Sequence, residues 1–181
     1  MSTVNGLPAH ILLVHAVVVL LPLAAFLLVL TAVWAPARRR LAAANAILSV
    51  LVVILVPITT DAGEWLERRV PQSALLHEHT ELGDTAIFYA IPIAILALVV
   101  WWRQIEATAP TGGRLSALAH RHEWLKPRSS ALTRLIAALA IVIAAAGVYG
   151  TYRIGDSGAK ATWTGNFSPT PAARDPHERP R

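Results

Sequence analysis

Four histidines lie where apolar segments of the chain begin, in positions where ionisable side chains are rare. His10 and His15 open the apolar run HILLVHAVVVLLPLAAFLLVL, and His77 and His79 belong to the motif HEHTE just before another such run. Imidazole is a ligand for haem iron and for Zn, Cu, Ni and non-haem Fe. The sequence therefore predicts a haem b or divalent transition-metal site that pairs His10 or His15 with His77 or His79.

Helical geometry limits how these histidines can combine. His10 and His15 are five residues apart, which separates them by about 140° around a helix of 3.6 residues per turn. They cannot both point at one centre without local distortion. On the third apolar segment, His77, Glu81 and Asp84 share one helical stripe if that helix starts before the membrane.

Carboxylates are concentrated near the same histidines and could support a metal ion. They are Asp61, Glu64, Glu78, Glu81, Asp84 and Asp156. An alternative interpretation is structural: the histidines hydrogen-bond these carboxylates, His10 with Glu78 or Glu81, and so clamp the helices together.

The elements that position these residues are four apolar helices. Hydrophobic residues make up 55% of the 181-residue chain and charged residues 15%, with a mean hydropathy of +0.50. Runs near 7–34, 41–60, 85–102 and 132–152 approach the roughly 20 residues that span a bilayer. We expect an all-α, polytopic membrane protein with a four-helix transmembrane domain over 1–164 and a disordered polar tail over 165–181. The chain has no cysteine, which excludes thiolate sites of its own.

Arginine and lysine residues predict the orientation of the bundle. They are concentrated after the first and third spans, where Arg38, Arg39, Arg40 and Arg103 lie, and are sparse between the second and third. This places both termini and the histidines outside the cytoplasm. The net charge of +5 is explained by this asymmetry, so nucleic acid is not an expected partner, whereas the lipid bilayer is. Between the third and fourth spans, 115–125 is expected to form a helix on the inner headgroups, with His120 and His122 on its basic surface.

The two halves of the chain resemble each other weakly. His10 and Pro22 in the first half correspond to His79 and Pro92 in the second, and Asp61-Ala62-Gly63 corresponds to Asp156-Ser157-Gly158. The pattern favours two pseudo-repeated helical hairpins whose Asp-x-Gly corners meet at the outer end. We expect Gly155 and Gly158 to end the last helix, and Lys160 to pair with Asp61 or Glu64 and join the halves.

The motif HILLVH resembles the His-Pro-x-Leu-Val-His-Phe-Pro signature of the bacterial membrane family known as domain of unknown function 2231. His10, Leu13, Val14 and His15 match this signature, whereas Ile11, Ala16 and Val17 depart from it. The resemblance covers Leu7 to Trp163 and implies a four-helix protein of the bacterial inner membrane. It carries no established activity, although some members occur beside Rieske-type redox domains, which favours electron-transfer surroundings.

Three functional hypotheses follow. The first is a haem- or metal-binding, redox-associated protein. The second is a non-catalytic accessory subunit of a larger membrane complex, such as a respiratory complex. Ala146 and Gly150 would let a partner helix approach closely, although packing within the bundle itself explains them better. The third is an ion or proton transporter, against which stands the absence of charge deep in the spans. Zinc-protease spacing is absent and no triad surrounds the Gly-Asp-Ser-Gly run, so the sequence does not favour an enzyme.

Overall fold

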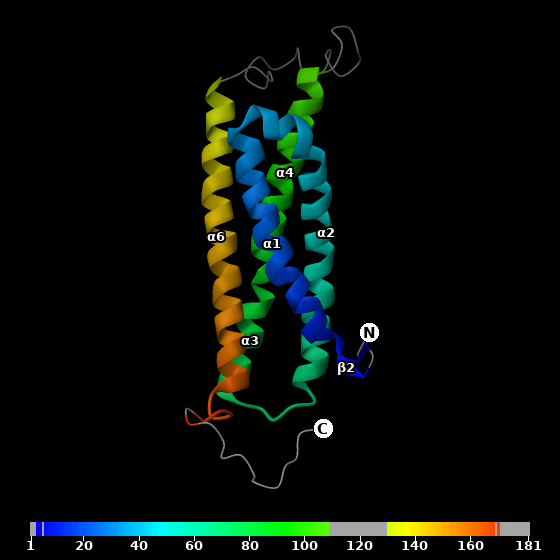
Figure 1. The fold of residues 1–181 in the computed structure, drawn as a ribbon, viewed down its shortest axis with the longest axis vertical. Helices are drawn as coiled ribbons and strands as arrows, with labels where there is room; N and C mark the ends of the chain where they lie inside the picture. Colours follow the sequence, from blue (N-terminus) through cyan, green and yellow to red (C-terminus); the bar gives the residue numbers. More distant parts are fainter. Residues whose placement is uncertain (1–2, 5, 109–129, 169, 171–181) are drawn as a thin grey trace.

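The protein is a bundle of long helices, shown in Figure 1 as a computed structural model that describes residues 3–4, 6–108, 130–168 and 170. The helices are α1 (Ala9–Val33), α2 (Ala35–Glu67), α3 (Ala74–Asp84), α4 (Ala86–Thr108) and α6 (Ser130–Trp163). Only Thr85 separates α3 from α4, so the two form one continuous segment. Four segments are thus long and apolar enough to cross a membrane. The expected all-α, four-helix membrane bundle is confirmed, and the third helix does start ahead of its apolar run.

The helices run alternately up and down, so that the ends of the bundle differ (Figure 1). Helix α1 packs against α2 and α6, and α4 packs against the same two helices from the opposite side. We call the end where α1 begins and α6 finishes the histidine end, and the opposite end the arginine end. At the histidine end a small ladder precedes α1, in which β1 (Thr3–Val4) pairs antiparallel with β2 (Leu7–Pro8).

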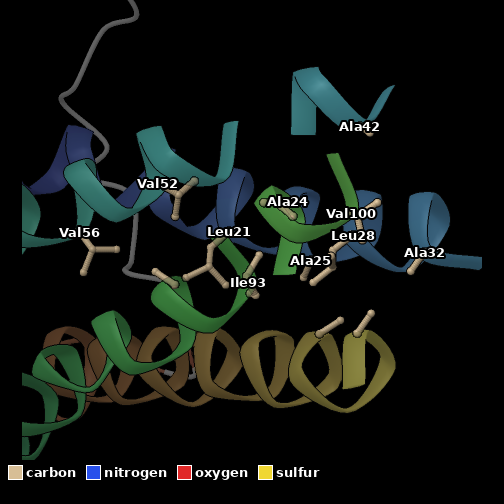
Figure 2. Packing of buried hydrophobic residues seen from close by; sticks show 14 of the residues in the cluster. Leu21, Ala24, Ala25, Leu28, Ala32, Ala42, Val52, Val56, Ile93 and Val100 are labelled. Atoms are coloured by element: carbon tan, nitrogen blue, oxygen red, sulfur yellow. The ribbon is translucent and has the colours of Figure 1, made fainter. Parts of the chain in front are cut away.

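Small side chains allow the helices to approach one another along the bundle axis. Ala24 and Ala25 of α1 are fully buried and lie in one apolar cluster with larger residues such as Ile93 of α4 (Figure 2). Bulky apolar residues such as Phe88, which is 72% exposed, lie on the outside. This arrangement suits a bilayer, where close packing rather than exclusion of water drives helices together.

Two polar side chains of α2 are buried in the middle of the bundle. With its carboxamide oriented to satisfy both groups, Asn45 donates from Nδ2 to Ala24 O and accepts at Oδ1 from Leu28 N, each at 3.2 Å. Asn45 therefore ties α2 to the backbone of α1. Ser49, one turn further along α2, is equally buried, and its Oγ has no hydrogen-bond partner.

The last helix corrects two expectations at the histidine end. The prediction that Gly155 and Gly158 end it is wrong, because α6 continues to Trp163 and is followed by Gly165 with φ +79°. A glycine that keeps its i→i−4 hydrogen bonds is tolerated in a membrane helix, whereas a left-handed glycine ends one. Lys160 does not join the halves either, because its Nζ pairs with Asp156 of its own helix at 2.7 Å.

Some predictions fall on parts of the chain that the structure does not describe. They concern the helix over 115–125 with His120 and His122, and the polar tail from 171 onward, which includes His177.

Candidate functional site: two histidines held by the neighbouring helices

His10 lies in the first turn of α1 and is fixed by α2. Its Nδ1 is 3.0 Å from Thr59 O, a carbonyl that can only accept, so Nδ1 carries the proton and donates it. The ring also packs against Gly63, where a Cβ atom would come within 3.0 Å of His10 Cε1 and Nδ1. The absence of a side chain at Gly63 is what lets the imidazole lie here.

His79 is held in the same way by the other pair of helices. Its Nδ1, on α3, is 3.0 Å from Ser157 Oγ on α6, and that hydroxyl donates its own proton to Ile154 O at 2.9 Å. Ser157 Oγ is therefore the acceptor and His79 Nδ1 the donor. A Cβ atom at Gly158 would come within 2.9 Å of His79 Cε1. Both histidines thus combine a proton on Nδ1 with a glycine of the paired helix.

The two imidazoles face each other across the bundle. Their ring centroids are 6.4 Å apart and their planes are inclined by 72°. Both rings line a predominantly apolar cavity of about 50 Å³, whose wall also includes Tyr89 and Thr151. Such a cavity holds a few water molecules. When Nδ1 carries the only proton of the ring, the second nitrogen, Nε2, has an available lone pair.

His15 and His77 are not brought into this arrangement. His15 is exposed, and its Nδ1 bonds Ile11 O of its own helix. His77 is also exposed, and its Nε2 lies 3.2 Å from Glu81 Oε1. The five-residue spacing explains the separation of His10 from His15, because only one of them can face the bundle axis.

The carboxylates lie at the histidine end but do not bond the two central histidines. Glu64 is near Arg68 at 3.6 Å, Asp156 binds Lys160, and Glu81 binds His77. Asp61, Glu78 and Asp84 are exposed. Across residues 3–4, 6–108, 130–168 and 170, no group of three or more His, Asp or Glu side chains is close enough to hold one metal ion.

The partners that do hold the histidines were missed by sequence reasoning. One is a main-chain carbonyl, at Thr59, which no residue pattern reveals. The other, Ser157, stands beside Gly158 in the Asp-Ser-Gly corner, and the correspondence with Asp61-Ala62-Gly63 did indicate that this corner meets a histidine.

Tyr89 lines the cavity between the histidines. It also forms a close contact between α4 and α6. A Cβ atom at Gly150 would come within 2.3 Å of Tyr89 Cε2, and one at Gly147 within 2.9 Å of Ile93 Cδ1. Gly150 therefore packs inside the bundle, which is the interpretation that the sequence favoured over a surface for another protein, whereas Ala146 is exposed.

Comparison with known proteins gives a family and no closer relative. A family model described as "Predicted membrane protein (DUF2231)" matches residues 6–170. No curated protein and no solved structure matches the chain. The family match includes the HILLVH motif, both helix pairs and the two histidines that face each other. This multi-pass membrane protein therefore belongs to the DUF2231 family.

Proposed function

We propose that the protein binds a transition-metal ion at the histidine end, with His10 Nε2 and His79 Nε2 as its ligands. The observation that carries this proposal is that each Nδ1 donates to an acceptor on the paired helix, which leaves both Nε2 lone pairs available beside one cavity. Metal-binding histidines in proteins are commonly fixed by such a hydrogen bond from the other ring nitrogen, which sets the tautomer and the ring orientation.

Two imidazole ligands limit which metals can bind and require further ligands to complete the coordination. Two imidazoles suit Cu, Zn, Ni or Fe, and further coordination positions are left for water or for a ligand from another molecule. A metal with open positions, in a membrane setting, supports a redox-associated role. Haem fits less well than a single ion, because a cavity of about 50 Å³ between the rings admits water molecules but not a porphyrin unless α1 and α3 separate.

Elemental analysis for Fe, Cu, Zn and Ni on the full chain in mild detergent tests this proposal, together with titration by Zn²⁺ and Cu²⁺. We expect stoichiometric metal that is lost in His10→Ala and in His79→Ala. His15→Ala and His77→Ala are matched controls, since they remove exposed histidines of the same helices and should retain the metal. Equal metal content in all four variants would contradict the proposal. A Soret band that responds to reduction would identify haem in place of a single ion.

The second candidate is a purely structural clamp within an accessory subunit. It is favoured by the contacts of each ring, since His10 joins α1 to α2 and His79 joins α3 to α6, each against a glycine. In that case His10→Ala lowers the stability of the bundle by the same amount with and without a chelator. Metal binding instead predicts that the chelator lowers the stability of the unsubstituted protein and leaves His10→Ala unchanged.

The orientation that we propose places the histidine end outside the cytoplasm of a bacterial inner membrane. It is supported by Arg38, Arg39, Arg40 and Arg103 at the arginine end. Because the chain has no cysteine, single-cysteine variants report position without background. In intact cells, a membrane-impermeant maleimide should label Glu78→Cys and should label Arg40→Cys only after the cells are opened. The reverse pattern would invert the orientation.

A further inference from the structure

A second cavity lies at the arginine end, remote from the two histidines. It measures about 280 Å³ and is surrounded by the start of α2, the end of α4 and the start of α6. Its polar wall consists of Arg38, Arg39, Arg103, Gln104, Thr108 and Thr133. Within the part of the chain that the structure describes, no acidic side chain lines it. The cavity is therefore a cationic recess with hydroxyl and amide groups between the arginines.

The arginines are held at the rim of this cavity by helix ends and by a neighbouring side chain. Arg38 Nη1 donates to Ala32 O at 3.1 Å and to Thr31 O at 3.4 Å, and so caps the last carbonyls of α1. Arg103 Nη2 donates to Thr133 Oγ1 at 3.1 Å and links α4 to α6. Arg39 is exposed and, among the described residues, forms no ion pair. Arg38 is only half-buried and retains further donors, since a guanidinium has five N–H groups.

We propose that this cavity binds the phosphate group of an anionic phospholipid. Guanidinium groups bind phosphate in a planar, two-pronged manner, and basic recesses between transmembrane helices are where anionic headgroups bind. A volume of 280 Å³ is just below that of a typical small-molecule pocket, which suits a glycerol phosphate headgroup rather than a whole lipid.

The surroundings of the cavity favour a lipid over free phosphate. Trp34 and Trp102 flank this end of the bundle, 55% and 53% exposed, and exposed indoles mark the level of lipid headgroups. The apolar part of the wall includes Ala32, Val100 and Ile136, which belong to the membrane-spanning helices. A phosphate in this recess would therefore lie at headgroup depth, with apolar side chains below it for the start of an acyl chain.

Native mass spectrometry of the detergent-solubilised full chain tests the proposal, with phosphatidylglycerol and phosphatidylcholine offered separately. We expect one phosphatidylglycerol to be retained in preference to phosphatidylcholine, and Arg39→Gln to weaken that binding about fivefold, as expected for one basic residue near a headgroup. Arg39→Gln removes no contact within the described bundle, so loss of folding does not confuse the result. Arg38→Gln combined with Arg39→Gln should weaken binding about 25-fold.

The matched control is Arg68→Gln combined with Arg69→Gln, which removes the same charge from an exposed arginine pair at the histidine end and should leave lipid binding unchanged. Inorganic phosphate at millimolar concentration provides the second arm. Displacement of the lipid by inorganic phosphate would assign the cavity to a free anion and overturn the lipid proposal. Equal retention of the two lipids, or equal weakening in both double variants, would overturn it as well.

Discussion

The histidine end and the arginine end of the bundle show how the same four helices produce two kinds of cavity. At the histidine end, glycines of α2 and α6 let two imidazole rings pack between the helices, and a predominantly apolar cavity of about 50 Å³ remains. At the arginine end, three long cationic side chains line a cavity that measures about 280 Å³. The two cavities thus differ both in volume and in the chemistry of the side chains that line them.

The largest loss of stability is expected from a substitution that prevents α6 from approaching α4 closely near the histidine end. Gly150→Ala places a Cβ atom within 2.3 Å of Tyr89 Cε2, so that the Tyr89 ring or helix α4 must shift. We expect this variant to lower the free energy of unfolding by about 3 kcal/mol, the upper range for overpacking. Unfolding in SDS, followed by circular dichroism, measures the change. Gly155→Ala, at an open position in the same helix, is the control and should be neutral or slightly stabilising.

A substitution at the contact between Gly158 and the His79 imidazole should lower stability less, and should also weaken metal binding. Gly158→Ala brings a Cβ atom within 2.9 Å of His79 Cε1, and the ring can rotate to relieve this contact. We expect a loss of about 1 kcal/mol in stability, together with weaker metal binding because His79 is displaced from Ser157. Metal titration of the folded variant measures the second effect. Unchanged metal affinity would show that the ring position set by Gly158 does not matter for binding.

Between the two ends, the buried polar side chains of α2 should contribute moderately to stability. Asn45→Ala removes two hydrogen bonds to the α1 backbone, for which we expect a loss of about 0.6 to 1.7 kcal/mol, the range of such bonds in membrane bundles. Ser49→Ala is the matched control, since it removes a hydroxyl that has no partner and should cost little or stabilise. A larger loss of stability in Ser49→Ala than in Asn45→Ala would contradict the assignment of the stabilising hydrogen bonds to Asn45.

The smallest effect is expected at the arginine end, where space is available. Ala107→Leu adds three carbon atoms at the edge of the cationic cavity, and Ala107 is exposed. We expect the free energy of unfolding to change by less than about 0.5 kcal/mol. The same SDS titration measures it. A loss comparable to that of Gly150→Ala would mean that the arginine end is packed as tightly as the histidine end.

Hydropathy and helical geometry predicted most of the fold and part of the site. The four apolar helices and the family were expected and are confirmed. The separation of His10 from His15 followed from helical geometry. The identity of the helix facing each histidine did not, because periodicity defines a face and says nothing of its neighbour. Gly158 was interpreted as a helix end because glycine is common there, and Gly63 as part of a matching corner, whereas here both provide space beside a ring.

The arginines illustrate a different limit of sequence reasoning. Arg38, Arg39 and Arg103 were used only to orient the chain, since a charge beside an apolar run is usually a topological signal. Their arrangement around one cavity depends on residues about 65 positions apart in the chain, and on the way α4 and α6 pack against the end of α1. Neither composition nor spacing contains that information.

The turn between α1 and α2 has a consequence for how the chain enters the membrane. Trp34 is the only residue between the two helices, and three consecutive arginines follow within the first two turns of α2. Carrying an arginine across the hydrocarbon core costs about 2.5 to 3.5 kcal/mol on the insertion scale. A turn this tight, followed at once by three such charges, should insert as a single hairpin and remain on the side from which it entered. The distinction between the two ends is then established during synthesis, as soon as Arg40 has been added and before His79 exists.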